Sequence, residues 1–193
     1  MALRSQLREA VRAAILDAAE ELIATRGLSG AGLLMIARRA GVAVGTLYNY
    51  FADREALIRA LFETRRAALR PKLLAAARLG EDLPFEPRLR RFMRELFEVF
   101  EAHRKFLAVA IESEAIKPSP STTPQDVQAA LAEIVAAGVA EGTVARAHAE
   151  LLPLVIAGAI RAIVLRRIAE HKPFGDAADT VVAILLDGIR CAR

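Results

Sequence analysis

The sequence lacks the features of disulfide-bonded, metal-binding and membrane-spanning proteins. Its 193 residues include one cysteine, Cys191, no tryptophan and only two tyrosines. A single cysteine excludes an internal disulfide framework and a cysteine-based metal site, and it is typical of a reducing cytoplasm. The longest apolar run, Leu151–Ile160, contains a proline and is too short to cross a bilayer, which takes about 20 apolar residues.

Catalytic signatures are also missing. The sequence contains none of the patterns G-x-S-x-G, G-x-x-x-x-G-K, H-E-x-x-H and G-x-G-x-x-G. Its three histidines lie far apart in sequence, and the first 22 residues have no apolar core followed by a cleavage site. We therefore expect a cytoplasmic protein that is not an enzyme, carries no cofactor or metal, and has no membrane segment.

The composition provides material for a core and a slight excess of positive charge near the start. Hydrophobic residues make up 54% of the chain and charged residues 26%, the usual share for a globular domain. Residues 1–66 hold ten arginines against seven acidic residues, whereas residues 67–193 hold seventeen basic against sixteen acidic residues. A basic surface attracts phosphate backbones, although ordinary solvated arginines explain this excess as well.

Apolar residues recur at the three- and four-residue spacing of an amphipathic helix, as at Val11, Ile15, Ala18 and Leu22. No alternating strand pattern competes, so the predicted fold class is all-α. The first predicted helix ends at Gly27, and the others cover about 33–40, 44–50, 53–77, 88–103, 106–114, 125–140, 147–171 and 176–189.

Glycines, prolines and one aspartate mark the breaks between these helices. Asp53 is a good N-cap for the fourth helix, and Pro71 should kink or divide that helix. Gly80–Pro87 is a predicted loop, and Lys117–Pro124, with three prolines among small polar residues, is a predicted flexible stretch.

Two short helices meet at a sharp turn within residues 36–51. Gly41 lies at the turn, where glycine accepts a left-handed conformation that other residues resist. Ala37 is small enough for the second helix to cross close above it, and Ile36 and Leu47 are spaced to fill a shared core. The pattern predicts a helix-turn-helix, whose second helix presents its N-terminal residues to the major groove of DNA.

Several side chains on or next to the second helix are candidates for DNA contact. The residues predicted to face the groove are Val44, Gly45, Thr46 and Asn49. Tyr48 and Tyr50 can donate hydroxyl hydrogen bonds to phosphates, although each taken singly is as well explained as a packing aromatic. Arg54 opens the next helix, where a cation is mildly unfavourable, and an external phosphate nearby would explain it.

The segment Ala14–Leu61 resembles the DNA-binding head of the TetR family of bacterial repressors. The matching elements are, in order, Ile15-Leu16-Asp17-Ala18-Ala19, Gly27-Leu28, Ile36-Ala37, Ala40-Gly41-Val42, Gly45-Thr46-Leu47-Tyr48, Tyr50-Phe51 and Asp53-Arg54-Glu55-Ala56-Leu57. The combination extends over about fifty residues in the right order, which makes it specific.

The resemblance implies a helix-turn-helix DNA-binding domain at residues 1–53 and a ligand-binding and dimerisation domain at residues 54–193. The head is expected to bind a twofold-symmetric operator in double-stranded DNA, and ligand binding in the body to release it, as in a repressor. The last two helices, at about 147–171 and 176–189, are expected to form the homodimer with their copies. By the same resemblance Thr46, Tyr48, Tyr50 and Arg54 contact phosphates, and Val44, Gly45 and Asn49 face bases.

The predicted DNA surface is unusually apolar, because Leu34 and Val44 stand where the family normally has polar residues. Such side chains contact thymine methyl groups but cannot make the bidentate hydrogen bonds that discriminate bases. Two hypotheses follow. Either the head reads a T-rich or shape-defined site, helped by Arg4, Arg8 and Arg12, or the chain is a ligand-sensing or partner-binding dimer with weak or lost operator binding.

The body offers candidates for a ligand site and for the dimer interface. The predicted lining residues are Phe92, Leu96, Phe100, Phe106 and Val109, with His103, Glu112 and His148 as polar groups. An apolar or weakly polar small molecule would suit such a site, although an ordinary core explains the same residues. Gly158 and Ala162, four residues apart, allow close helix approach at a dimer interface or, alternatively, within a monomer core.

Overall fold

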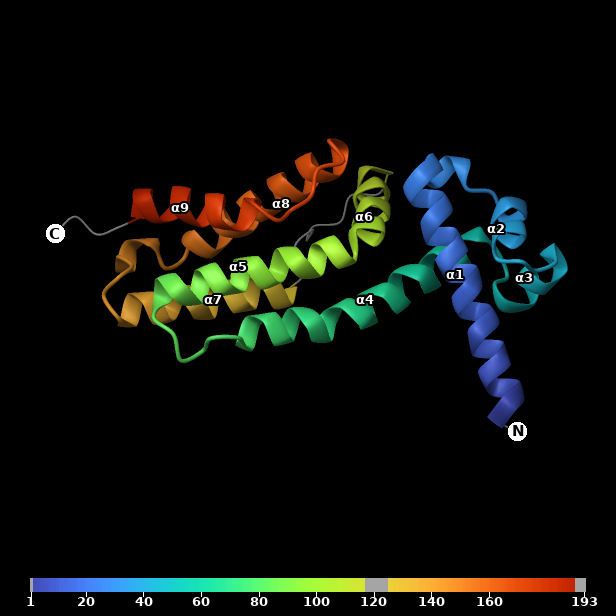
Figure 1. Cartoon of the computed structure of the whole chain (residues 1–193), viewed down its shortest axis with the longest axis horizontal. Helices are drawn as coiled ribbons and strands as arrows, with labels where there is room; N and C mark the ends of the chain where they lie inside the picture. The colour runs from blue at the N-terminus through green and yellow to red at the C-terminus, as the bar shows by residue number, and fades with distance from the viewer. Residues whose placement is uncertain (1, 117–124, 190–193) are drawn as a thin grey trace. The chain divides into compact units, whose positions relative to one another are not determined.

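A computed structural model describes residues 2–116 and 125–189 of the chain. The predicted flexible stretch Lys117–Pro124 and Cys191 lie outside the described residues. Every regular element of the described residues is a helix, which confirms the predicted all-α fold class (Figure 1).

The helices begin and end close to the predicted limits. They are α1 (Ala2–Gly30), α2 (Leu33–Arg39), α3 (Val44–Tyr50), α4 (Arg54–Arg78), α5 (Phe85–Ala102), α6 (Arg104–Ile116), α7 (Gln125–Ala140), the short 3₁₀ helix η1 (Arg146–His148), α8 (Leu152–Ala169) and α9 (Ala177–Ile189). None of the described helices combines the length and the apolar character that crossing a membrane requires.

The chain divides into two compact units. The head unit comprises Met1–Ala68 with Lys105–Pro118, and the body unit comprises Leu69–Arg104 with Ser119–Arg193. The head unit therefore holds residues on both sides of the predicted boundary at residue 53, because the first part of α4 and nearly all of α6 belong to it. The division of the chain by function at that boundary stays a prediction.

Local chemistry explains where several helices begin. Asp53 caps α4 as predicted, since its Oδ1 accepts the backbone N–H of Ala56 at 2.7 Å. Pro71 does not divide α4, because it is exposed and water can take the place of its missing hydrogen bond. α8 begins at Leu152 rather than at residue 147, with Pro153 in its first turn, a position that proline favours.

The region around Phe85 also differs from the prediction. α5 begins at Phe85, inside the predicted loop, with Pro84 as N-cap and Pro87 within the first turn. Proline is tolerated there because the first N–H groups of a helix have no partner within the helix. The backbone N–H of Phe85 donates instead to the Glu141 carboxylate at 3.0 Å.

The head core is built from α1, α2, α3, the first part of α4 and one residue of α6. Ile15, Ile36, Leu47 and Leu57 are fully buried in it, and Val109 of α6 belongs to the same cluster. The residues on one face of α1 that the spacing predicted are thus buried or partly buried against this core.

The body core forms where α5 packs between α7 and α9, with α8 against α7 (Figure 1). Phe97 of α5 stacks on Phe174, which precedes α9, with ring centroids 5.8 Å apart. α7 approaches α5 closely at Gly138, where a Cβ atom would lie 2.6 Å from the Phe85 ring. Only glycine fits there, because the ring is fully buried and cannot move aside.

Candidate nucleic-acid interface

A tight turn joins α2 to α3. Gly41 has a φ of 71°, in the left-handed region that favours glycine. The N–H of Gly41 donates to the carbonyl of Arg38 at 3.2 Å, and the N–H of Val42 donates to that of Ala37 at 3.0 Å. These bonds close the C-terminus of α2 and direct the chain into α3. The turn predicted at Gly41 is therefore confirmed.

One side of α3 is fixed in the core and the other faces outward. Leu47 of α3 and Ile36 of α2 are both fully buried in the head core. Gly45 and Asn49, four residues apart and on the opposite side of α3, are exposed. No atom lies within 4 Å of a Cβ built on Gly45, so this part of the helix is open to a close approach.

Exposed side chains flank this open strip. Tyr48 is 51% exposed and Leu34 on α2 is 53% exposed. The remaining predicted contacts on this helix are half-buried, namely Val44, Thr46 and Tyr50. The predicted contact residues on α2 and α3 thus offer an amide, a hydroxyl, two tyrosines and apolar side chains.

Arginines of α1 lie beside the end of α3. The guanidinium carbon of Arg8 lies 5.9 Å from the centroid of the Tyr50 ring, a cation–π distance. Arg12 lies 5.8 Å from the Phe51 ring and donates through Nη1 to the hydroxyl of Thr64 at 3.4 Å. Arg12 is therefore tied to the head, whereas the exposed Arg8 guanidinium stands next to Tyr50.

Arg54 has an acceptor inside the head unit. Its guanidinium donates to the backbone carbonyl of Leu28, and the side chain is half-buried. This internal carbonyl offsets the unfavourable position of a cation at the start of α4, so an external phosphate is not needed to explain it. Contact between Arg54 and DNA stays a prediction.

Two arginines at the end of α2 were not predicted as DNA contacts. The sequence signal that could have indicated them is a pair of adjacent arginines in the last turn of a helix. Arg38 and Arg39 are both exposed. Arg39 pairs with Glu21 of α1 at 2.6 Å. The hydrogen bond from Arg39 lowers the pKa of the Glu21 carboxyl below its ordinary value, and the positive charges of Arg39 and Lys105 add to the effect.

Comparisons with known proteins agree with this geometry. The sequence profile described as "Bacterial regulatory proteins, tetR family" matches residues 15–61, which contain α2, the turn and α3. The TetR transcriptional regulator SCO0520 from Streptomyces coelicolor is 30% identical to the chain, with a TM-score of 0.53, and the match covers 94% of this chain and 99% of that one. The chain belongs to the TetR family. This family consists of transcriptional regulators and not of enzymes.

Other members of the family are similar over part of the sequence or in fold. The HTH-type transcriptional regulator YvdT of Bacillus subtilis is 33% identical over 105 residues, which cover 54% of this chain and 53% of that protein. The chain thus spans about half the length, or less, of the curated relatives it matches. FadR from Bacillus subtilis, solved in complex with stearoyl-CoA, is 22% identical with a TM-score of 0.69, over 92% of this chain and 98% of that one. That likeness shows the TetR fold alone.

Three of the predicted ligand-lining residues belong to the head unit. Phe106 packs edge-on against Phe62, with ring centroids 5.6 Å apart, and Val109 is fully buried in the head core. The Glu112 carboxylate accepts the backbone N–H of Leu28 at 2.6 Å. All three residues thus have structural contacts within the head, and a part in ligand binding stays a prediction.

The other predicted lining residues lie in the body unit. The apolar ones share one buried face of α5, namely Phe92, Leu96 and Phe100. Nε2 of His103, at the end of α5, lies 2.9 Å from Nζ of Lys72. His148 is exposed in η1. The structure therefore groups the three apolar residues of α5 and does not place His148 in the core with them.

An apolar face of α8 and α9 is left uncovered. Leu151, Leu154, Val155 and Ile184 are between 55% and 68% exposed. A Cβ built on Gly158 would meet no atom within 4 Å. Large aliphatic side chains exposed in this number on neighbouring elements are typical of a surface that a partner covers.

A hollow of about 400 Å³ lies between α8 and α9, lined in part by charged residues. Each of these charges is in an ion pair, with one positive charge in excess: the Glu170 carboxylate pairs with both Arg166 and Lys172 at 2.9 Å, and Arg167 pairs with Asp176 at 2.7 Å. Hydrogen bonds from Lys172 and then Arg166 lower the pKa of the Glu170 carboxyl. The hollow therefore offers little unpaired charge to a ligand.

Proposed function

We propose that the chain is a DNA-binding transcriptional repressor whose α3 reads the major groove of an operator. The observation that carries this proposal is the outward face of α3, which is open at Gly45 and exposed at Asn49 while Leu47 anchors its other face. A helix held in this way by a helix-turn-helix presents its outer side chains to base edges. Membership in the TetR family supports the same role.

The surface divides into base-reading and phosphate-binding side chains. Asn49 carries the amide suited to bidentate pairing with adenine, and Val44 and the exposed Leu34 suit thymine methyl groups. The hydroxyls of Tyr48 and Tyr50 are proposed to bind phosphates that flank the groove. The operator is therefore expected to be rich in A·T pairs where α3 contacts it.

The proposed assembly is a homodimer formed through the exposed apolar face of α8 and α9. Leu154, Val155 and Ile184 would be buried there, and the open Cβ position at Gly158 lets a partner helix approach closely. A dimer places two copies of α3 on two half-sites, so the operator is expected to have twofold symmetry.

Release of the DNA is proposed to follow binding of a small molecule in the body unit. FadR from Bacillus subtilis, which has the same fold, was solved in complex with stearoyl-CoA, and this supports a small-molecule effector for the present chain. In this chain the buried face of α5 with Phe92, Leu96 and Phe100 is the proposed apolar wall of the site.

Fluorescence anisotropy with labelled DNA from upstream of the protein's own gene tests this proposal. An unrelated duplex and a salt series are the controls, because non-specific binding is equal on both duplexes and vanishes with moderate salt. Selective, tight binding supports an operator-binding repressor. Equal, weak binding on these duplexes, together with no enriched site in a genome-wide selection, would favour the alternative, a ligand-sensing or partner-binding dimer. The exposed apolar side chain of Leu34 is the feature that supports this alternative.

A further inference from the structure

The body unit contains one buried charged side chain without a counter-charge. Arg88, in the first turns of α5, is 8% exposed and is the only charged or polar residue that is buried among those the structure describes. Its Nε is completely buried and has no hydrogen-bond partner. Nothing in the part of the chain that the structure describes forms an ion pair with it.

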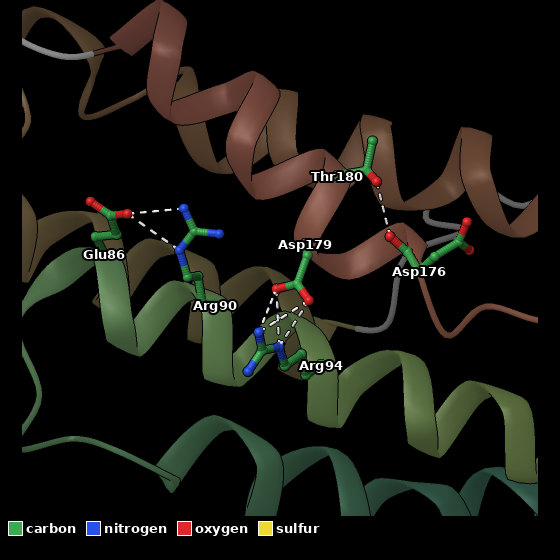
Figure 2. A network of polar contacts seen from close by, with 6 residues as sticks. All are labelled: Glu86, Arg90, Arg94, Asp176, Asp179 and Thr180. Carbon is green, nitrogen blue, oxygen red and sulfur yellow. Dashed lines mark hydrogen bonds and ion pairs between the residues drawn. The ribbon is translucent and has the colours of Figure 1, made fainter.

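Two neighbouring arginines of α5 form ion pairs with carboxylates. Arg90 pairs with Glu86 one turn earlier at 2.9 Å, and Arg94 pairs with Asp179 of α9 at 2.8 Å (Figure 2). Both are more exposed than Arg88, so water can also solvate them. Arg88 is therefore the least exposed arginine of this helix, and unlike Arg90 and Arg94 it has no anion beside it.

An available carboxylate is not used to neutralise Arg88. Glu141 reaches the start of α5, but it accepts the backbone N–H of Phe85 at 3.0 Å and makes no ion pair with the Arg88 guanidinium. Arginine keeps its charge in folded proteins, and a buried N–H group without an acceptor is unfavourable. An anion from outside the described chain would remove this penalty.

We propose that Arg88 binds the anionic group of a small amphipathic molecule, a carboxylate or a phosphate joined to an apolar body. The planar guanidinium matches the two oxygens of such a group. Phe85 and Phe92, three residues before and four after Arg88 on the helix, share its side of α5, and both rings are buried. The part of the molecule next to the anion is therefore expected to be apolar. This inference deepens the proposed function, since it names the chemistry of the effector.

Thermal unfolding and isothermal titration of the full chain test the proposal with four probes. Octanoate and octyl phosphate carry the anion and the apolar chain, 1-octanol has the chain alone, and inorganic phosphate has the anion alone. The variants are Arg88→Met, which removes the charge at similar length, and Arg91→Met, which alters an exposed arginine of the same helix.

Octanoate or octyl phosphate is expected to raise the melting temperature of the wild type and of R91M. R88M should lose about ten-fold or more of the affinity for that anion, the loss expected for a charge-assisted pair, and bind 1-octanol like the wild type. Without any probe R88M should melt at the same or a higher temperature than the wild type, because a buried N–H group without an acceptor is gone.

Three results would overturn the proposal. The first is the same affinity of R88M and wild type for both amphipathic anions, or no binding by either protein. The second is a full Arg88-dependent shift with inorganic phosphate alone, which rejects the apolar body. The third is a lower melting temperature of R88M without probe, which makes Arg88 a structural residue. If R88M does not fold, Arg88→Lys replaces it, and unchanged octanoate affinity in that variant rejects the guanidinium site.

The operator assay separates this inference from the proposed function. Arg88-dependent anion binding by a protein that fails to select DNA supports the site and rejects the repressor. Selective DNA binding that the bound anion does not weaken supports the repressor and rejects Arg88 as part of its effector site.

Discussion

The backbone N–H of Leu28 donates a 2.6 Å hydrogen bond to the carboxylate of Glu112, 84 residues further along the chain. Leu28 follows Gly27, whose φ of 77° and ψ of 163° interrupt the helical conformation of α1. The carbonyl of the same Leu28 accepts the guanidinium of Arg54. One residue at this break thus connects α1 to α6 and to the start of α4.

Gly27 is expected to be required for this arrangement. A Cβ at that position would lie 2.8 Å from Oε1 of Glu112, and the positive φ is itself unfavourable for alanine. Gly27→Ala should lower the free energy of unfolding by about 1–3 kcal/mol in urea titrations. Gly45→Ala is the control, since that helical site has open space and a negative φ, and it should leave stability unchanged or slightly raised. Equal effects of the two variants would contradict the role of Gly27.

The two kinds of DNA contact on α3 are expected to separate by mutation. Asn49→Ala should weaken operator binding by about 1–3 kcal/mol and leave an unrelated duplex unaffected, because it removes a base contact. Tyr48→Phe should weaken both duplexes alike by about 1 kcal/mol, because it removes a phosphate donor. Anisotropy titrations measure both effects, and circular dichroism checks that the exposed substitutions leave the fold intact. If both variants bind the operator as tightly as the wild type, α3 is not the helix that reads the DNA.

Arg8 is expected to add one phosphate contact beside Tyr50. Its exposed guanidinium stands 5.9 Å from the Tyr50 ring, so a phosphate bound by the tyrosine hydroxyl would also meet the arginine. Arg8→Gln should reduce the slope of log K against log salt by about 1, with operator preference unchanged. Arg78→Gln, an exposed arginine of the body unit, serves as control and should leave the slope as in the wild type. A wild-type slope for both variants would place Arg8 away from the DNA.

The exposed face of α8 is expected to hold the dimer together. Val155→Glu would bury an unpaired carboxylate at the interface, which is strongly unfavourable, so the variant should sediment as a monomer in analytical ultracentrifugation. Leu74→Glu places the same charge on an exposed leucine of α4, where Leu74 is 37% exposed, and should remain a dimer. A dimeric V155E protein would mean that a different surface forms the assembly.

The Glu21–Arg39 pair is expected to have a measurable pH signature. Its hydrogen bond lowers the pKa of Glu21 in the folded state, so the pair stabilises the fold above the ordinary carboxyl pKa. That contribution is lost as the pH falls through the lowered value. Carbon-13 NMR titration should show Glu21 titrating below an ordinary glutamate, and Arg39→Gln should bring its pKa back up. An unshifted Glu21 in the wild type would show that the pair is not formed in solution.

Much of the head was predictable because its signals are local. The turn at Gly41, the span of α3 and the cap at Asp53 each depend on residues within a few positions of one another. The start of α8 was predicted five residues too early, because Ala147 and Ala149 suit a helix and only the position of Pro153 marks the true first turn.

The contacts between distant segments were not predictable. An apolar stripe on residues 106–112 predicts burial, but its spacing is the same whether it packs in a ligand site or in the head core. The structure shows that this segment contacts Phe62 and Leu28 of the head, which lie far away in sequence. The acceptor of Arg54 is a backbone carbonyl 26 residues earlier, which no side-chain pattern reveals.

By itself, the sequence determined that the chain is all-helical, that α3 follows a glycine turn, and that it resembles the TetR family, because helix periodicity and turn chemistry act over short distances. The tertiary structure alone decided that Glu112 holds the break in α1, that an apolar face of α8 and α9 stays open, and that Arg88 is buried without a counter-charge. Burial and ion pairing depend on which segments meet in space, and the order of residues along one helix does not specify them.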